Sequence, residues 1–465
     1  MKRILLAGTA ILLAGWGAQA QNFPETKLTA SDGEAGDRFG TSVAVSGGTV
    51  LVGASGDGDF ANGSAYLFDA DGTETKLIPS DGALLDFFGD AVALNASTAL
   101  IGALGADGAA SNGGAAYLYD ADGGETKLTA SDATSSGEFG ASVALSASTA
   151  LIGAPGADGE VLDSGAAYLF DADGTETKLT ASDGAILDSF GISVALSGGT
   201  ALVGAPGFSS GSAYLFDSEG TETKLTASDG AGFDQFGFSV ALSGDTALVG
   251  APFDDDDGEN SGSAYLFDGN GTETKLTASD GAADDEFAWS VALSGNLALV
   301  GAHFDDDNGT DSGSAYLFDA RSGAELAKLT ASDGAASDRF GVSVALDGST
   351  AVVGTSNANG FTGAVYVYDL SPTWTASFGG AYDDPGNWNA VTPEIGVFDV
   401  KIDPDSSQTI TGPSGASEVG TLFLGRGAGV ATLDLQQGGG ILAEDGVEIG
   451  ANGSLQGTGG IVGDI

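Results

Sequence analysis

The stretch FGFSVALSGDTALVGAP, residues 236–252, decides the fold because it holds two short strands and the turn that joins them. The runs SVAL and TALVGA are apolar and are bounded by turn formers, as expected for buried strands. Neither run alternates between apolar and polar residues, which indicates a sheet that is covered on both faces by other sheets. The stretch therefore predicts half of a small antiparallel sheet that packs between neighbouring sheets.

This stretch recurs as part of a unit of about fifty residues, a period typical of repeat architectures. Each unit opens with KLTASDG or a near copy and continues with F-G-x-S-V-A-L, a turn, A-L-V-G-A-P, a variable loop, G-S-A-Y-L-F-D and a D-G-T-E-T turn. The heptapeptide begins at Lys27, Lys76, Lys127, Lys178, Lys224, Lys275 and Lys328. Each unit predicts four short strands, and no segment has a helical period.

The two ends of the repeat region predict how the units close. The chain opens with a lone outer strand, residues 24–30, and the last unit supplies three strands, residues 340–346, 350–354 and 363–369. If the opening strand completes the last sheet, the sheets form a ring without unpaired edges. The predicted fold class is therefore all-β: a seven-bladed β-propeller closed by an N-terminal outer strand, followed by a short β-solenoid-like domain. A linear solenoid is the alternative, but it leaves both end pieces unpaired.

The repeated stretches also carry a family resemblance. FGTSVAVSGGTVLVGAS, FGISVALSGGTALVGAP and FGFSVALSGDTALVGAP resemble FG-GAP repeats, the blades of integrin α-subunit propellers, and are more similar to the bacterial surface-protein version with KLTASDG. The resemblance covers residues 21–370 and implies a propeller, but such propellers serve adhesion, scaffolding and catalysis. In integrin repeats a calcium loop, D-x-[DN]-x-DG-x-x-D, joins the first two strands. Here that connection is a tight hairpin such as residues 243–246, so those ligands have no counterpart.

Composition excludes several classes of function. The chain has 65 acidic against 14 basic residues and a formal charge of −51, so it would repel nucleic acid. Hydrophobic residues make up 42%, enough for a sizeable core. There is no cysteine and one histidine, His303, which excludes disulfides, thiolate metal sites and multi-histidine centres.

Acidic residues recur at fixed places and accumulate in two variable loops. One aspartate lies seven residues before the Phe of each unit, and a second lies two residues before it in six units. We expect these links to lie on the same propeller face as the variable loops, which are expected to be exposed. The candidate metal ligands in the fifth and sixth loops are Asp254, Asp255, Asp256, Asp257, Glu259, Asp305, Asp306, Asp307 and Asp311.

Two interpretations of these acids are open. Carboxylates and loop carbonyls suit Ca²⁺, and the two adjacent loops could form one acidic groove. Alternatively, aspartate caps turns through its own backbone, which we favour for the positions repeated in every unit. The consecutive aspartates of the fifth and sixth loops exceed what a turn requires, so calcium is the predicted cofactor there. Neither loop is an EF-hand, because Phe253 or Phe304 would occupy the first ligand position.

Other candidates for chemistry are few. His303 replaces the proline of G-A-P in the sixth unit, and we interpret it as a loop substitution and not as a general base. Trp289 follows Phe-Ala where other units have Phe-Gly; packing accounts for it, although an exposed indole could stack on a sugar. No catalytic triad, phosphate loop or dinucleotide fingerprint is present. We therefore predict no enzyme.

Both ends of the chain differ from the repeats. Residues 1–20 have a basic start, a short apolar run and an Ala18-Gln19-Ala20 exit, which predict a signal peptide cleaved after Ala20. No later segment is long and apolar enough to predict a membrane span. Residues 371–465 contain short strands broken by glycine and resemble the β-solenoid tails of autotransporter-like proteins. Since a solenoid needs a capped last rung, we expect the natural chain to extend past Ile465.

These patterns together predict a secreted or cell-surface propeller that binds a ligand without catalysis and with calcium as an assisting ion. The expected partner is an extracellular protein or glycan, and nucleic acid is not expected. A carbohydrate-active propeller enzyme is one alternative, because two of the many acidic residues could form the carboxylate pair that glycoside hydrolysis requires. A structural cell-envelope component without a discrete ligand is the other.

Overall fold

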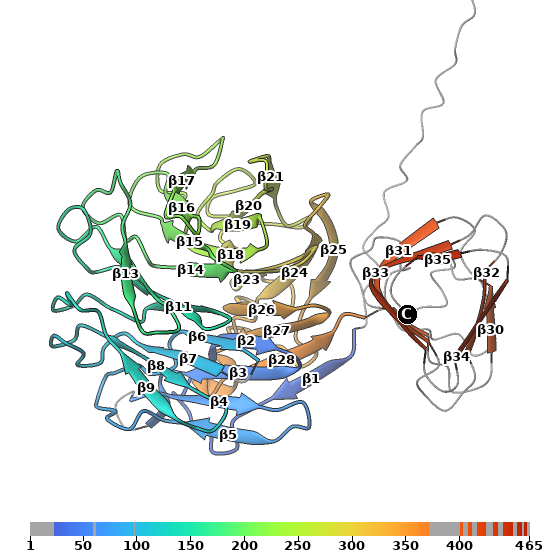
Figure 1. Cartoon of the computed structure of the whole chain (residues 1–465), viewed down its shortest axis with the longest axis horizontal. Coiled ribbons are helices and arrows are strands. Elements are labelled where there is room, and N and C mark those ends of the chain that lie inside the picture. The colour runs from blue at the N-terminus through green and yellow to red at the C-terminus, as the bar shows by residue number, and fades with distance from the viewer. Residues whose placement is uncertain are drawn as a thin grey trace, which may run out of the picture.

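The computed structural model describes residues 23–58, 62–96 and 98–371 and seven strands between Val400 and Val462. The predicted signal peptide, residues 1–20, lies outside the described residues. Six four-stranded antiparallel sheets follow one another along residues 39–329, and each runs from an innermost to an outermost strand. We number these sheets blades one to six, and Figure 1 shows them arranged around a common centre.

The strand bounds repeat closely from blade to blade. Blades one and two consist of β2 (Phe39–Ser46), β3 (Thr49–Ala54), β4 (Ser64–Phe68), β5 (Glu74–Leu77), β6 (Val92–Asn95), β7 (Thr98–Ala103), β8 (Ala115–Tyr119) and β9 (Glu125–Leu128). Blades three and four consist of β10 (Ser142–Ser146), β11 (Thr149–Ala154), β12 (Ala166–Phe170), β13 (Glu176–Leu179), β14 (Val194–Ser197), β15 (Thr200–Ala205), β16 (Ser212–Phe216) and β17 (Glu222–Leu225). Blades five and six consist of β18 (Ser239–Ser243), β19 (Thr246–Ala251), β20 (Ser263–Phe267), β21 (Glu273–Leu276), β22 (Phe287–Ser294), β23 (Leu297–Ala302), β24 (Ser314–Asp319) and β25 (Ala324–Leu329).

Blade seven joins the two ends of the propeller. Its strands are β26 (Ser343–Asp347), β27 (Thr350–Thr355), β28 (Ala364–Asp369) and β1 (Glu25–Leu28). The N-terminal strand β1 pairs antiparallel with β28, with Thr26 opposite Val367, and so forms the outer edge. The innermost strands contact one another in sequence, and β26 contacts β2. The predicted closure by the N-terminal strand is confirmed, and the fold is a seven-bladed β-propeller.

Close packing within and between blades explains the FG and GAP letters of the repeat. Phe236 is fully buried, and its ring meets Tyr265 of the same blade edge-on at 5.5 Å. A Cβ at Gly204 would lie 1.9 Å from the carbonyl oxygen of Gly237 in the next blade, so only glycine permits this approach. The apolar strands are therefore buried between sheets, as their lack of alternation predicts.

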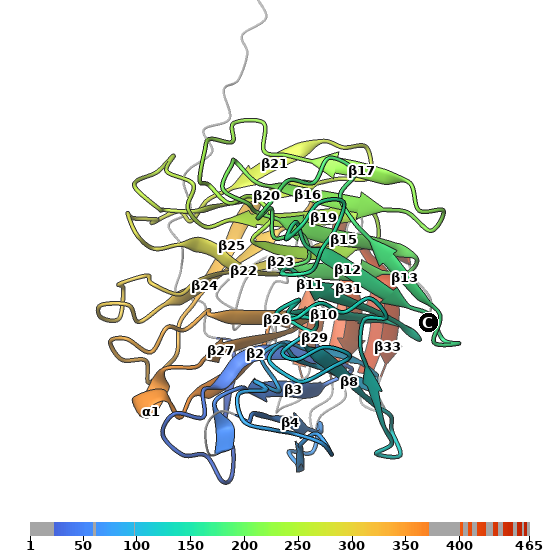
Figure 2. The same cartoon turned by 90° about the vertical axis from the view of Figure 1, so that its left-hand side faces the viewer.

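Links and loops lie together on one face of the ring. A link joins the outer strand of one blade to the innermost strand of the next, and a loop joins the second and third strands of one blade. The Phe233 amide of the blade-five link donates to the Ser209 carbonyl of the blade-four loop at 2.8 Å, and Asp284 of the blade-six link donates likewise to Glu259 at 2.7 Å. We call this side the loop face. It includes the short helix α1 (Ala358–Phe361), labelled in Figure 2.

The C-terminal strands are described by themselves. They are β29 (Val400–Ile402), β30 (Gln408–Thr411), β31 (Ala416–Leu424), β32 (Ala431–Leu435), β33 (Gly440–Ile449), β34 (Gly453–Gly457) and β35 (Gly460–Val462). They form two parallel sheets, β29-β31-β33-β35 and β30-β32-β34, between which the chain alternates. Such pairing is what a β-solenoid requires, and the solenoid assignment of residues 371–465 stays a prediction.

Candidate functional site

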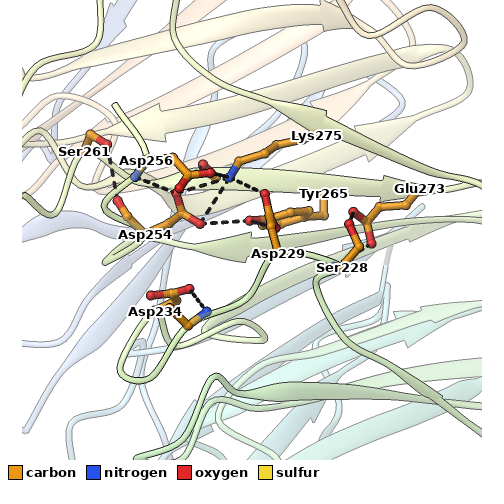
Figure 3. A network of polar contacts seen from close by, with 11 residues as sticks. Ser228, Asp229, Asp234, Asp254, Asp256, Ser261, Tyr265, Glu273 and Lys275 are labelled. Carbon is orange, nitrogen blue, oxygen red and sulfur yellow. Dashed lines mark hydrogen bonds and ion pairs between the residues drawn. The ribbon is translucent and has the colours of Figure 1, made fainter. Parts of the chain in front are cut away.

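A contact among Asp, Tyr and Lys recurs in every blade. It explains the lysine and the aspartate of the KLTASDG heptapeptide. In blade five, Lys275 Nζ lies 2.9 Å from Asp229 Oδ2, the Tyr265 hydroxyl donates to Asp229 Oδ1 at 2.9 Å, and Lys275 lies 5.2 Å from the Tyr265 ring centroid (Figure 3). The equivalent sets are Asp32, Tyr66 and Lys76; Asp81, Tyr117 and Lys127; Asp132, Tyr168 and Lys178; Asp183, Tyr214 and Lys224; Asp280, Tyr316 and Lys328; and Asp333, Tyr366 and Lys27. The aspartate seven residues before each Phe is thus an architectural residue.

A second contact fastens each link to the outer strand of the blade it enters. The Ser228 amide and hydroxyl donate to the Glu273 carboxylate at 3.1 and 2.6 Å. The same pairing joins Ser31 to Glu74, Ser80 to Glu125, Ser131 to Glu176, Ser182 to Glu222, Ser279 to Glu325 and Ser332 to Glu25. Because Glu25 and Lys27 belong to β1, the closing blade is fastened like the other six.

The aspartate two residues before the Phe caps a turn. The Ala231 amide donates to Asp234 Oδ2 at 2.6 Å, and the Ala282 amide donates to Asp285 Oδ2 at 2.7 Å. The turn-capping interpretation is correct for this position. Burial raises the pKa of Asp285 to about 6, despite the amide that it accepts.

The leading aspartates of the blade-five and blade-six loops are buried, which corrects the expectation that these loops are exposed throughout. Asp254 is 3% exposed and accepts hydrogen bonds from Ser263 Oγ at 3.0 Å and Tyr265 OH at 2.9 Å. Lys275 Nζ lies 3.3 Å from it and also contacts Asp256 (Figure 3). Sequence reasoning missed these contacts because the lysine lies about twenty residues away, on the outer strand.

Blade six repeats this arrangement. Asp305 is 3% exposed and accepts from Ser314 Oγ at 2.9 Å and Tyr316 OH at 2.7 Å, and Lys328 Nζ lies 2.8 Å away. Lys328 also contacts Asp307. Burial raises the pKa of Asp305, but the hydrogen bonds from Lys328 and Tyr316 outweigh it and hold that pKa below its ordinary value.

The nine predicted metal ligands therefore divide into two groups. Four of them, Asp254, Asp256, Asp305 and Asp307, each contact a lysine ammonium. The carboxylates without a lysine contact are those of Asp255, Asp257, Glu259, Asp306 and Asp311. Among the residues that the structure describes, no group of three or more acidic or histidine side chains is arranged to hold a metal ion. Calcium binding stays a prediction that depends on the second group.

A row of edge-on and tilted ring contacts joins blade five to blade six. Phe253 meets Phe238 with ring centroids 6.4 Å apart, and Phe238 meets Trp289 at 4.5 Å. Trp289 meets His303 at 4.5 Å, and His303 meets Phe304 at 3.9 Å. We call these five residues the aromatic row. The residues at the Trp289 position in the remaining blades are Thr41, Asp90, Ala141, Ile192 and Val342, so no other blade pair repeats this row.

Three buried polar atoms without hydrogen-bond partners lie at the blade-six end of the row. They are His303 Nδ1, Glu286 Oε2 and Arg339 Nε, and the Arg339 guanidinium lies 4.7 Å from the Phe304 ring centroid. His303 is 2% exposed, and its Nε2 lies 3.8 Å from Glu286 Oε2. Burial, with the nearby Arg339 charge, lowers the pKa of His303 to about 3, whereas burial and Asp284 raise the pKa of Glu286 to about 7. The imidazole is therefore neutral at pH 7.

A shallow pocket of about 350 Å³ adjoins the other end of the row. Its lining includes Phe233 and Gln235 of the blade-five link and Phe253, Asp255 and Glu259 of the blade-five loop. The loop face at blades five and six thus combines rings, carboxylates and a hollow. Sequence reasoning named Trp289 and His303 separately, and their departure from the repeat in the same blade was the signal that they belong together.

The fold and these repeated contacts define the chain as a seven-bladed propeller built from one repeat. An FG-GAP repeat model matches residues 24–68, 72–119, 123–170, 174–216, 220–267, 271–318 and 324–368, so the chain belongs to the FG-GAP repeat family. The finer resemblance to integrin-α-like bacterial secreted members stays a prediction. No curated protein matches the chain significantly.

Two solved structures share the propeller fold. A virginiamycin B lyase from Staphylococcus aureus, in a selenomethionine form, aligns with a TM-score of 0.53 and 9% identity over 75% of this chain and 99% of its own. A streptogramin B lyase structure aligns with a TM-score of 0.50 and 10% identity over 74% and 97% of the two chains. At such identity the likeness concerns the fold alone. Within the described part of this chain, no helix has the length and apolar character of a membrane span.

Proposed function

We propose that this chain is a secreted or cell-surface ligand-binding propeller that acts without catalysis, and that its ligand is an extracellular glycan bound at the aromatic row. The observation that carries the proposal is a difference between the blades. Blades five and six have aromatic residues at the repeat position of Trp289, and the other five blades have non-aromatic residues there. Trp289 is partly exposed within a row of rings that no other blade pair has. Aromatic faces bordered by polar groups suit a ligand with an apolar face and hydroxyl edges.

Secretion is proposed from the N-terminal segment. The loop acids support the same function, because carboxylates without a lysine contact are ligands that suit Ca²⁺ and polar partners for sugar hydroxyls. Asp255 and Glu259 line the pocket that begins at Phe253. Calcium is therefore proposed as an assisting ion and not as a structural requirement of the blades.

The proposal is tested by a glycan array probed with the parent chain and with Trp289→Ala. Ile192→Ala is the matched control, because Ile192 occupies the same repeat position in blade four and is also partly exposed. Loss of the indole should weaken binding about tenfold or more, since a buried aromatic contributes about 1.5 to 3 kcal/mol. Ile192→Ala should bind as the parent does. Equal binding by all three proteins would place the site elsewhere.

A carbohydrate-active enzyme is the second candidate, favoured by one observation. The Glu286 carboxyl has a pKa raised to about 7 beside a buried imidazole, and such perturbed groups are typical of general acids. If this candidate is correct, glycans that bind should also be cleaved, and Glu286→Gln should abolish the cleavage while binding remains.

A further inference from the structure

Large apolar side chains are exposed side by side on the loop face of blades three to five. Leu162, Ile186, Leu187, Phe208 and Phe233 are each between 50% and 67% exposed. We call these five residues the apolar arc. Single exposed apolar residues are ordinary on protein surfaces, but a contiguous group of them marks an interaction site.

Backbone hydrogen bonds make the arc continuous. The Leu187 amide of the blade-four link donates at 2.9 Å to the carbonyl of Asp163, the residue after Leu162 in the blade-three loop. The Phe233 amide of the blade-five link donates at 2.8 Å to the carbonyl of Ser209, the residue after Phe208. Because the Gly207 amide of the blade-four loop also donates to the Asp188 carbonyl of the blade-four link at 3.1 Å, the five residues lie on loops and links that are hydrogen-bonded to one another in sequence.

Two members of the arc occupy backbone positions that disfavour them. Leu187 has φ +65° and Phe233 has φ +77°, in the left-handed region that bulky residues rarely adopt. The residues at the same repeat position in the other five blades are Gly36, Leu85, Ser136, Asp284 and Ser337, four of which are small or polar. The repeat thus imposes this conformation in every blade, and at Leu187 and Phe233 it presents a large apolar side chain to solvent.

The charge around the apolar arc indicates which kind of partner binds there. The pocket at the Phe233 end contains Phe253 and the carboxylates of Asp255 and Glu259. The chain carries a net charge of −51, which opposes a second copy of the chain and an anionic lipid surface alike. A partner with both apolar side chains and positive charge is complementary to the apolar arc and to the acidic pocket.

We propose that the apolar arc and the adjoining pocket bind a basic amphipathic segment of a partner protein. Its apolar side chains cover Leu162, Ile186, Leu187 and Phe208. A lysine or arginine enters the pocket between the rings of Phe233 and Phe253, where cation–π attraction and the two carboxylates hold its charge. The pocket adjoins the aromatic row through Phe253, whereas none of the five residues of the apolar arc belongs to the row. Changes in the arc therefore test this proposal, and Trp289→Ala tests the proposed glycan site separately.

The test uses the full chain and a fluorescent synthetic peptide, KLLKLLKKLLKLLK, titrated in EDTA so that calcium does not contribute. The arc variant is the triple change Leu187→Ser, Phe208→Ser and Phe233→Ser. Leu85→Ser is the matched control, because Leu85 has the same repeat position, φ +66° and 56% exposure, in blade two. Serine occupies the position of Leu85, Leu187 and Phe233 in two other blades, and Phe208 is an exposed loop residue, so the variants are expected to fold.

The arc variant should bind the peptide at least about tenfold more weakly than the parent, while Leu85→Ser binds unchanged. The double change Asp255→Asn and Glu259→Gln should weaken binding as well, and more at low salt than at high salt. Equal affinity of the arc variant and the parent would overturn the proposal. So would self-association of the parent that the arc variant abolishes, or binding to phosphatidylcholine vesicles without binding to the peptide.

Discussion

Replacing Lys328 by methionine should destabilise the propeller strongly. Lys328 contacts the carboxylates of Asp280, Asp305 and Asp307, and Asp305 is almost fully buried. Without the lysine, Asp305 keeps the hydrogen bonds from Ser314 and Tyr316 but has no cation. Removing one partner of a buried ion pair costs about 3 to 5 kcal/mol, and that is the expected loss in free energy of unfolding.

Blade four supplies the matched control, because its loop has no acid. Lys224 pairs at 2.7 Å with Asp183 alone, and the Asp183 side chain is 53% exposed. Lys224→Met should therefore cost less than about 1 kcal/mol. Urea unfolding followed by circular dichroism and tryptophan fluorescence measures both losses near neutral pH.

The pH dependence provides a second readout of the same pair. The pKa of Asp305 is held below its ordinary value of 3.8, so its ion pair stabilises the parent above about pH 4 and this stability is lost as the pH falls further. The difference between parent and Lys328→Met should therefore shrink in acid. Equal small losses for Lys328→Met and Lys224→Met, or a difference independent of pH, would refute the reasoning.

Three further predictions concern closure, calcium and the buried carboxyl. Deleting residues 24–30 removes the outer strand of blade seven, so aggregation or loss of cooperative thermal unfolding is expected, and unchanged unfolding would contradict the closure. Replacing Asp255, Asp257 and Asp306 by asparagine should lower the calcium stoichiometry measured by calorimetry and leave the circular dichroism unchanged; the parent stoichiometry in the variant would exclude these loops. Burial raises the pKa of Glu286 from 4.5 to about 7. The protonated carboxyl therefore stabilises the fold fully below pH 4.5, and this stabilisation is lost as the pH rises through 7. The free energy of unfolding of Glu286→Gln should therefore exceed that of the parent by up to about 3 kcal/mol at about pH 8 and equal it at about pH 4. A difference that does not depend on pH would show that the carboxyl is not desolvated.

The fold could be predicted from the sequence because the repeat determines local structure and closure together. The seven units and the lone strand at residues 24–30 predict the pairing of β1 with β28 that the structure has. The glycine of G-A-P is explained by its close approach to the next blade. These features follow from residue spacing and steric limits, which one sequence displays fully.

The site could be predicted only in part, because its contacts join residues from different strands and blades. The acidic runs of loops five and six are visible in the sequence, but the ion pair between Asp254 and Lys275 depends on how the outer strand lies against the loop. Trp289 and His303 are visible as departures from the repeat. Their ring contact, and the Glu286 Oε2 atom without a hydrogen-bond partner beside them, appear only when the blade is folded.

Binding without turnover at the aromatic row can be distinguished from catalysis in a single experiment. The chain is incubated with each glycan that it binds, with the bound fraction and the glycan mass followed in the same sample. We predict saturable binding that Trp289→Ala weakens, with every glycan recovered at its original mass. Cleavage or elimination products that form with the parent, and that Glu286→Gln abolishes, would contradict the claim and identify an enzyme.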